Sequence, residues 1–375
     1  MLKEEHRLLR EALREFAAER LIPFAAQWDR EHHFPAAQIK ELAAMGLFGI
    51  AVPEPWGGAG MDTTAIAVAL EEIAAGDGGT STVISVNNSP VCAILLRYAS
   101  DAQKEQWLRP LASGQWLGCF CLTEPQAGSD AADLRTRAVR EGDDWVIDGV
   151  KQFITSGKNA DVAIVFAVTD PAAGKRGISA FILPTRTPGY TVARIEAKMG
   201  QHSSDTAQIV FDRVRVPAAN LIGQPGEGYK IALSSLEAGR IGIAAQAIGM
   251  ARAALEAAQK YAQERITFGQ PIAGHQAISF QLAEMATQIE AARQLVHHAA
   301  ALKDAGEPCL TQACMAKLFA SEMAERVCSN AIQIHGGSGY MSDFPVERIY
   351  RDVRVCQIYE GTSEVQKMII ARGLS

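Results

Sequence analysis

The amino-acid sequence predicts an α+β protein that is mainly α-helical and is built from three successive parts. Hydrophobic residues recur with a helical period up to about residue 117, alternate as in strands from Gly118, and return to the helical period after Gly226. The length of 375 residues also exceeds the size at which a single core usually stops growing. We therefore predict an N-terminal α-helical domain over 1–117, a middle antiparallel β domain over 118–225 and a C-terminal helical bundle over 226–375.

Composition and charge exclude several classes of protein. Hydrophobic residues make up 48% of the chain and charged residues 21%, as in ordinary globular proteins. A net charge of -6 and a pI near 5.8 argue against a nucleic-acid partner or an anionic membrane partner. The first residues are acidic and amphipathic, unlike a secretory signal or a transit peptide, and no apolar run is long enough to span a bilayer. We therefore expect a cytoplasmic protein.

Cysteine and histidine spacing predicts no metal site. The seven cysteines include no Cys-x-x-Cys pair, and we expect all of them to be reduced and mostly buried. The eight histidines are scattered, and the adjacent pairs His32-His33 and His297-His298 lack the i, i+4 spacing of a helical metal site.

The N-terminal part contains amphipathic and apolar helices. An apolar stripe from Leu8 to Phe16 predicts the first helix, and the alanine-rich stretch 61–75 predicts another. The Pro- and Gly-rich segment 53–60 forms a loop between them, and the sequence Asn-Asn-Ser-Pro at 87–90 predicts a break in the helical run that follows.

In the middle part, alternation of side chains predicts several short strands. Asp148-Gly149 lies between two of them, which favours a two-residue hairpin at that point. The predicted strand segments are 145–147, 150–154, 161–168, 178–183, 190–195 and 208–216.

The C-terminal part is predicted to hold long helices with unusual interior glycines. Each of Gly239, Gly242 and Gly249 costs about 1 kcal/mol relative to Ala in a helix. Gly242 and Gly249 share one smooth face, which predicts close helix packing. Gly239 lies at the margin of that face beside Arg240, so its missing side chain is expected to leave space for a group other than the packed helix. The predicted helices are 229–264, 275–304, 310–334 and 365–372, with a short helical piece at 346–355.

The turn at 358–364 carries the most informative acid. Gly361 allows close approach of a ligand to the backbone, and Thr362 or Ser363 can cap the following helix. Two interpretations of Glu360 remain at this point: an exposed acid in a helix-capping turn, or a functional carboxylate held by that turn.

Three further segments are candidates for binding an anion or a flat ring. No Gly-x-Gly-x-x-Gly follows a strand and no P-loop motif occurs, so these nucleotide sites are improbable. Segment 121–130 is either a turn whose backbone N–H groups at Gly128-Ser129 point at a phosphate or an ordinary polar turn. Phe153 and Thr155 share one face of a strand, with Phe153 as core filler the alternative. Segment 333–339 has three glycines, more than a helix C-cap requires.

Together these segments resemble the acyl-CoA dehydrogenase family of flavoenzymes, over nearly the whole chain. Segment 122–130 resembles the family's flavin signature, 333–340 its C-terminal signature and 358–364 the loop that bears the catalytic base. The resemblance implies the acyl-CoA dehydrogenase fold, with a C-terminal four-helix bundle, bound FAD and a homotetramer arranged as a dimer of dimers.

The resemblance also implies roles for individual residues. Phe153 and Thr155 would contact the isoalloxazine, Thr155 toward N5, and many relatives have Trp where Phe153 stands. The FAD contacts within one subunit would be Phe120, Leu122, Thr123, Gly128, Ser129, Phe153, Ile154 and Thr155. Those to the FAD of a neighbouring subunit would be Arg265, Thr267, Phe268, Gln276, Gln333, Gly336 and Gly337. Thr362 and Glu364 would meet the adenosine side. The acyl-CoA contacts would be Ser129, Glu237, Gly239, Arg240, Gly361 and Arg372.

The activity that the resemblance implies is dehydrogenation of an acyl-CoA to the trans-2-enoyl-CoA. Glu360 would remove the α proton, flavin N5 would accept the β hydride, and an electron-transfer flavoprotein would take the electrons. Residues 236–243 are similar to those of short-chain and short-branched-chain members. A buried carboxylate would have a raised pKa, which makes it a stronger base.

Two alternatives remain at this stage. One is a flavin oxidase of the same fold, although the chain is shorter than most acyl-CoA oxidases and Glu360 stands where a nitroalkane oxidase would have Asp. The other is a catalytically silent helical scaffold or binding protein, which would not require Glu360, Thr155 and two Gly-rich loops together.

Overall fold

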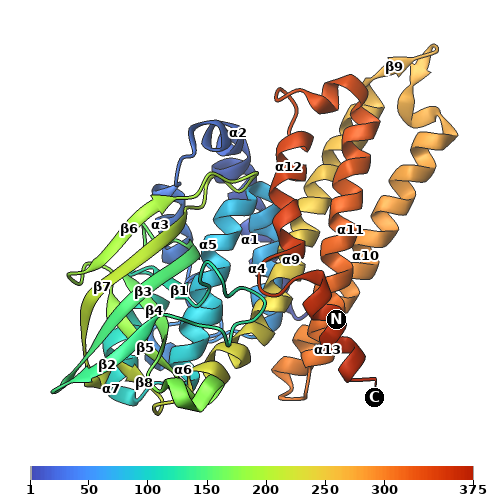
Figure 1. Ribbon diagram of the computed structural model, residues 1–375. Helices are drawn as coiled ribbons and strands as arrows, with labels where there is room; N and C mark the ends of the chain where they lie inside the picture. Colours follow the sequence, from blue (N-terminus) through green and yellow to red (C-terminus); the bar gives the residue numbers. More distant parts are fainter. Residues whose placement is uncertain (1, 375) are drawn as a thin grey trace.

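A computed structural model describes residues 2–374 and shows helices, then a sheet, then helices (Figure 1). Within residues 2–374, no helix is both long and apolar enough to cross a bilayer. The N-terminal α-helices are α1 (Glu4–Phe16), α2 (Ile22–Glu31), α3 (Ala36–Ala44), α4 (Thr63–Gly76), α5 (Gly78–Val86), α6 (Ala93–Tyr98), α7 (Asp101–Gln103) and α8 (Arg109–Ala112). Short π-helical or 3-10 turns join them: η1 (Ala17–Leu21), η2 (Glu54–Trp56), η3 (Asn87–Cys92) and η4 (Lys104–Leu108).

Side-chain caps explain where the central helices begin. Asp62 accepts a hydrogen bond from the Ala65 N–H at the start of α4, and Asp77 accepts one from the Thr80 N–H at the start of α5. The predicted break at 87–90 is a kink: Ser89 leaves the helical conformation (φ -142°) because the following Pro90 disfavours it. The helical run resumes in α6.

The middle part is one mixed sheet in the order β6-β7-β3-β2-β4-β5-β8, with β1 paired to β4. Most neighbours are antiparallel, as predicted; β1 and β2 each run parallel to β4. The strands are β1 (Gly118–Cys121), β2 (Arg137–Glu141), β3 (Asp144–Thr155), β4 (Val162–Val168), β5 (Ile178–Pro184), β6 (Tyr190–Ile195), β7 (Thr206–Pro217) and β8 (Leu221–Ile222), with the turns η5 (Pro171–Gly177) and η6 (Ala218–Asn220).

The predicted hairpin at Asp148-Gly149 is wrong. Strand β3 runs through both residues, and the tight turn lies earlier, at Gly142 and the residue after it, where Glu141 pairs with Asp144. The register between β3 and β7 shifts at Gly149, so the Asp-Gly signal marks a β-bulge within a continuous strand. A side chain at Gly149 would start 2.4 Å from the Thr136 hydroxyl, which explains the glycine.

The C-terminal part is a bundle of the long helices predicted from the sequence. A small hairpin of β9 and β10 projects from one end of it (Figure 1). On α10 the side chains of Met285, Ile289, Ala292 and Val296 are buried, and those of Ile278 and Leu282 are half-buried. The elements are α9 (Gly228–Glu264), β9 (Ile266–Thr267), β10 (Gln270–Pro271), η7 (Ile272–Gly274), α10 (Gln276–Asp304), α11 (Leu310–His335), η8 (Gly336–Tyr340), α12 (Val346–Val353), η9 (Arg354–Gln357) and α13 (Ser363–Arg372).

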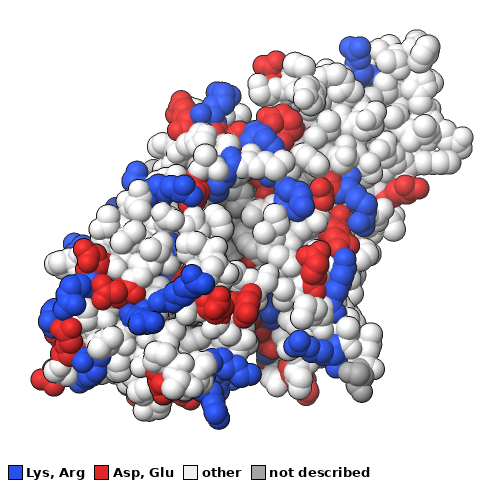
Figure 2. All heavy atoms as spheres, in the orientation of Figure 1, with Lys and Arg blue, Asp and Glu red and all other residues white. Residues whose placement is uncertain are grey.

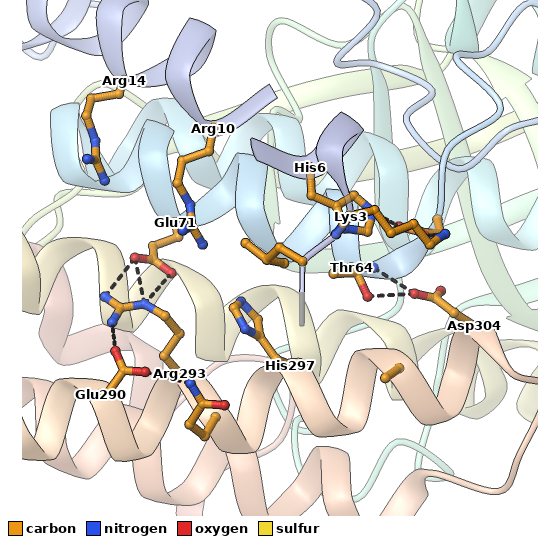
Figure 3. Close-up of a pocket in the computed structure, with 14 residues that line it drawn as sticks. Lys3, His6, Arg10, Arg14, Thr64, Glu71, Glu290, Arg293, His297 and Asp304 are labelled. Atoms are coloured by element: carbon orange, nitrogen blue, oxygen red, sulfur yellow. Dashed lines mark hydrogen bonds and ion pairs between the residues drawn. The ribbon is translucent and has the colours of Figure 1, made fainter. Parts of the chain in front are cut away.

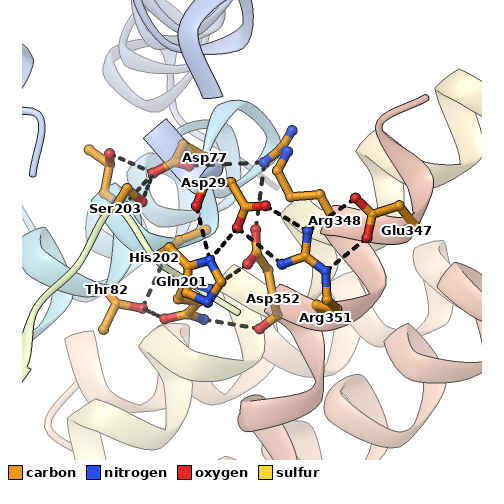
Figure 4. A network of polar contacts seen from close by, with 12 residues as sticks. Asp29, Asp77, Thr82, Gln201, His202, Ser203, Glu347, Arg348, Arg351 and Asp352 are labelled. Atoms are coloured by element: carbon orange, nitrogen blue, oxygen red, sulfur yellow. Dashed lines mark hydrogen bonds and ion pairs between the residues drawn. The ribbon is translucent and has the colours of Figure 1, made fainter. Parts of the chain in front are cut away.

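Buried polar side chains join the three parts (Figure 4). Arg351 of α12 pairs with Asp29 of α2 at 2.6 Å, and Thr82 of α5 donates to the Gln201 side chain at 2.7 Å. The Gln201 N–H in turn donates to Asp352 of α12. Buried polar groups are costly unless satisfied, so these contacts favour one relative placement of the helices and the sheet.

All seven cysteines are free and buried, as predicted. Cys119 and Cys121 alternate on β1 with their sulfur atoms 3.8 Å apart, so they share a face of the strand. Burial raises the pKa of Cys92 to about 12, which keeps it a neutral thiol.

The interior glycines of α9 allow close packing on α4. A Cβ at Gly249 would lie 2.1 Å from the Glu71 carbonyl oxygen, and one at Gly242 would lie 3.0 Å from a terminal methyl group of Leu70. Backbone cannot yield as a side-chain end can, so Gly249 fixes the distance between the two helices.

We predict that Gly249→Ala destabilises the protein and that Gly242→Ala has little effect. Overpacking against backbone costs roughly 1–3 kcal/mol, whereas a gain in helix propensity of about 1 kcal/mol offsets the milder contact at Gly242. Thermal unfolding of both variants measures the difference. Equal midpoints would show that α9 and α4 separate easily.

Candidate active site

Glu360 lies in the turn between η9 and α13. Its backbone is left-handed (φ 52°) and so is that of Gly361 (φ 93°), where a glycine avoids strain. Thr362 caps α13 by accepting a hydrogen bond from the Val365 N–H, as the sequence indicated. The Gln366 amide donates to the Gly361 carbonyl oxygen at 2.8 Å and closes the turn. The turn is therefore fixed on both sides of Glu360.

The Glu360 carboxylate occupies the space left by Gly239 of α9. A Cβ at Gly239 would lie 1.7 Å from the Glu360 Oε2 atom, so any other residue there would displace the acid. Oε2 is buried and has no hydrogen-bond partner among residues 2–374. Burial raises the pKa of Glu360 to about 7, although the charges of Arg240 and Lys317 act in the opposite direction. The interpretation of Glu360 as an exposed capping acid is therefore wrong.

The loop after β1 is tied to β3. The Gln152 N–H donates to the Thr123 carbonyl oxygen at 2.8 Å, and the Lys151 ammonium donates to the Leu122 carbonyl oxygen at 2.9 Å. Two segments that the sequence singled out separately, 121–130 and 153–157, are thus neighbours in space. In the first of them Gly128 and Ser129 are exposed, as a surface open to a ligand requires.

A buried ion pair holds that loop. Lys151 Nζ and Glu124 Oε1 are 2.7 Å apart, and both side chains are almost fully buried. The same carboxylate accepts hydrogen bonds from the Arg135 and Thr136 N–H groups. Burial alone would raise the pKa of Glu124, but the Lys151 charge and these hydrogen bonds hold it below its usual value. The carboxylate therefore stays ionised and anchors the loop.

Phe153 is presented to the outside of the sheet. It is 61% exposed and has a left-handed backbone (φ 59°) at a register shift between β3 and β7. Ile154 is buried and Thr155 is half-buried, so the hydroxyl of Thr155 remains within reach of a ligand beside the ring. Within the described chain Phe153 is therefore not core filler.

The predicted contacts to the FAD of a neighbouring subunit lie at the far end of the bundle. Phe268 is 97% exposed, and Gly336 and Gly337 face open space. The end of α9 and the turn η8 meet there, because the Tyr261 hydroxyl donates to the Ser338 hydroxyl. Figure 2 shows few charged side chains over this end. The structure thus groups these residues with one another, away from Phe153 and Glu360: Arg265, Thr267, Phe268, Gln276, Gln333, Gly336 and Gly337.

The predicted acyl-CoA contacts lie on α9, on α13, in the Glu360 turn and, at Ser129, in the loop after β1. Glu237 is half-buried and accepts from Lys303 at 3.1 Å, whereas Arg240 is buried near Glu360. Arg372 is exposed near the end of α13, and Glu364, a predicted FAD contact, is exposed in its first turn. Figure 2 shows a hollow between the sheet and the bundle, where a ligand would meet both.

The residues fit a flat aromatic cofactor. An exposed ring at Phe153, a half-buried hydroxyl at Thr155 and open backbone at Gly128 offer a surface, a polar contact and room for a phosphate. No group of the described chain hydrogen-bonds to the buried Glu360 oxygen, so this oxygen is available as a base.

Sequence reasoning missed two buried lysines near this site. Lys151 and Lys317 are both completely buried, the first beside the β1 loop and the second beside the Glu360 turn. Each interrupts a stretch of mostly apolar residues, and that interruption was the available signal.

A cavity of about 650 Å³ lies elsewhere, between α1, α4 and α10 (Figure 3). Its charged side chains pair with one another, for example Arg293 with Glu71 at 3.0 Å. Glu5, His6 and Asp62 could geometrically hold a cation there, but the Lys3 ammonium already lies 2.9 Å from Asp62. This cavity contains none of the predicted site residues.

A smaller, largely apolar cavity of about 220 Å³ lies beside the candidate site. Side chains of α4, η3, α6 and α9 line it, among them Leu70, Ile94 and Ile241. Ala238, the neighbour of Gly239 in α9, is also part of its wall.

The chain matches descriptions of three domains: the acyl-CoA dehydrogenase N-terminal domain over residues 3–115, the middle domain over 119–214 and the C-terminal domain over 226–375. It is 48% identical over 370 residues to the human mitochondrial short-chain specific acyl-CoA dehydrogenase, covering 99% of this chain and 90% of the relative. Butyryl-CoA dehydrogenase from Megasphaera elsdenii has a TM-score of 0.97 at 42% identity, covering 100% and 99%. A chain solved in work on the electron transferring flavoprotein of Acidaminococcus fermentans has a TM-score of 0.98 at 45% identity, covering 100% and 98%.

Fold, site and relatives together define a flavin-dependent oxidoreductase with FAD as its cofactor. The chain belongs to the acyl-CoA dehydrogenase family.

We predict that Lys151→Met lowers both the unfolding temperature and the amount of FAD retained. It leaves the Glu124 carboxylate buried without its cation, which costs roughly 3–5 kcal/mol. Adding Glu124→Gln removes the uncompensated charge, so the double variant should lose less than the two single variants combined.

Thermal unfolding and flavin absorbance measure both effects, with Lys158→Met, at an exposed position in the turn after β3, as the control. Strictly additive losses would contradict an anchoring role for the pair.

Proposed function

We propose that this protein dehydrogenates a short or short-branched acyl-CoA to the trans-2-enoyl-CoA, with Glu360 as the catalytic base. The observation that carries the proposal is the buried Glu360 carboxylate, whose unpartnered Oε2 fills the gap left by Gly239. Because this oxygen atom makes no hydrogen bond within the described residues, it is available to accept a proton from a ligand.

The reaction breaks two C–H bonds of the substrate and forms a C2=C3 double bond. Glu360 takes the α proton. Its raised pKa of about 7 makes it a stronger base than an ordinary carboxylate and leaves part of it ionised near neutral pH. FAD supplies the two-electron acceptor for the hydride that leaves the β carbon. Phe153, Thr155 and Gly128 would hold the flavin against the sheet, so that the thioester lies between the sheet and Glu360.

The thioester oxygen gains negative charge while the α proton leaves. Backbone N–H groups of the Glu360 turn would stabilise that charge, because the turn is fixed by Gln366 and by the Thr362 cap before the substrate arrives. Arg240 and Glu237 of α9 would border the rest of the acyl-CoA.

A short acyl group is supported by the relatives and by the cavity beside Gly239. The human relative is specific for short chains, and the Megasphaera enzyme is a butyryl-CoA dehydrogenase. The cavity that Ala238 helps to line has only about 220 Å³, room for a few carbons beyond the thioester.

The far end of the bundle supports a homotetramer. Its predicted FAD contacts lie away from Phe153, so they would serve the cofactor of another subunit, with exposed Phe268, Ile266 and Tyr340 buried between subunits. An electron-transfer flavoprotein is proposed as the acceptor, supported by the likeness to the chain from the Acidaminococcus work.

We predict that Glu360→Gln keeps the fold, FAD and thioester binding but slows flavin reduction by butyryl-CoA roughly 10³-fold or more. The amide has the same shape and cannot take the proton. Stopped-flow bleaching of the flavin measures the rate. Glu322→Gln, at a carboxylate on α11 that pairs with Lys367, is the control.

In the unmutated enzyme, kcat/KM should rise with pH and reach half its maximum near pH 7, because only the ionised Glu360 is a base and its pKa is about 7. A wild-type rate in Glu360→Gln would identify another base.

We predict that butyryl-CoA and its 2-methyl analogue are better substrates than palmitoyl-CoA. The comparison is kcat/KM with an artificial electron acceptor over acyl chains of increasing length. A higher kcat/KM for the sixteen-carbon thioester would contradict the short-chain proposal and leave the base assignment untouched.

A further inference from the structure

Lys317 is a buried cation that the packing of α11 does not require. Its side chain is completely buried, and its ammonium donates to the Gly361 carbonyl oxygen at 2.7 Å. Burying an ammonium is costly unless the charge meets a partner. No carboxylate lies within ion-pair distance of it among the described residues. The groups around the ammonium must therefore explain why a lysine is buried here.

The hydrogen bond alone does not account for Lys317. The Gln366 amide also donates to the Gly361 carbonyl oxygen, at 2.8 Å, so that oxygen would keep a partner without the lysine. A neutral side chain would serve the turn at a lower cost of burial.

The property of Lys317 that the hydrogen bond leaves unexplained is its positive charge beside Glu360. The carbonyl that holds the ammonium belongs to the residue directly after Glu360, and the unpartnered Oε2 atom of Glu360 lies in the same buried region. Burial lowers the pKa of Lys317 to about 8, so it is mostly charged at neutral pH. The charged or titratable groups that face this pair are Arg240 of α9, Cys314 of α11, Cys356 of η9 and Glu364 of α13.

Arg240 is the other cation near Glu360, and it differs from Lys317 in one respect. It lies on α9 beside Gly239, where the proposed function already assigns it to the border of the acyl-CoA. Lys317 approaches from α11 and is held through the backbone of the turn, so a substrate that engages Arg240 leaves it in place.

We propose that Lys317 is a positioning residue that acts through Glu360: its charge, fixed by the Gly361 carbonyl, keeps the buried carboxylate ionised and ready to take a proton. This proposal rests on the proposed function, because it assigns to Lys317 the tuning of the same base. Lys317 itself exchanges no proton with the substrate.

The test compares the pH dependence of flavin reduction in Lys317→Met, Lys317→Gln and the unmutated holoenzyme, with butyryl-CoA as the substrate. Removing a nearby cation should move the half-maximal pH upward by about one unit, which lowers the rate about fivefold at pH 7 and leaves it unchanged well above pH 9. Both neutral variants should shift alike, since Gln keeps a donor and loses only the charge. Lys367→Met, at an exposed lysine of α13, is the control and should not shift.

The outcomes separate the two proposals. If the unmutated enzyme reduces its flavin and Glu360→Gln does not, the base assignment holds, and an unshifted profile in the Lys317 variants then overturns only the role of Lys317. An equal loss of rate at every pH, or failure of both neutral variants to fold, would give Lys317 a structural role and also overturn it. Flavin reduction that survives Glu360→Gln removes the proposed base itself.

Discussion

The placement of one carboxylate oxygen in a buried space, without a hydrogen-bond partner in the described chain, is the constraint on which the candidate site depends. Glu360 has that space because α9 carries no side chain at Gly239 and because the turn before α13 holds a left-handed backbone at Glu360 and Gly361. Burial disfavours the charged form of Glu360 and so raises its pKa to about 7. The rest of the molecule supplies rigidity: α11 and Gln366 hold the turn, and the sheet offers the opposite wall.

The structure places two buried lysines at opposite sides of this site, and their surroundings differ. Lys151 meets the Glu124 carboxylate directly, so its charge is compensated within the sheet and fixes a loop. In the part of the chain that the structure describes, the Lys317 ammonium donates to a carbonyl oxygen and pairs with no carboxylate, so its charge can act on the nearby Glu360. The same residue type therefore serves anchoring in one place and, by the proposal made for it, electrostatic tuning in the other.

Much of the fold followed from the sequence because periodicity and breakers carry that information locally. The long helices of the bundle were found in this way. Asp148-Gly149 was misinterpreted because the same dipeptide suits a hairpin and a bulge, and only pairing with β7, some sixty residues later in the chain, distinguishes them. Glu360 was recognised by resemblance, but its burial depends on Gly239, a contact between distant segments. The roles of Lys151 and Lys317 could not be found because a lysine in an apolar stretch gives no sign of what it meets.

The separation of the two groups of predicted FAD contacts has a consequence for how activity depends on concentration. Under the proposed assembly, Phe153 and Phe268 of one chain serve different cofactors, so no single subunit holds a complete pocket. By mass action, dilution would then release the flavin together with the subunits, and bound FAD would in turn favour assembly. In a mixed pair, a defect at the β9–β10 hairpin of one chain and a defect at Glu360 of its neighbour would fall in the same pocket and leave the other pocket intact, so the two defects would partly complement each other.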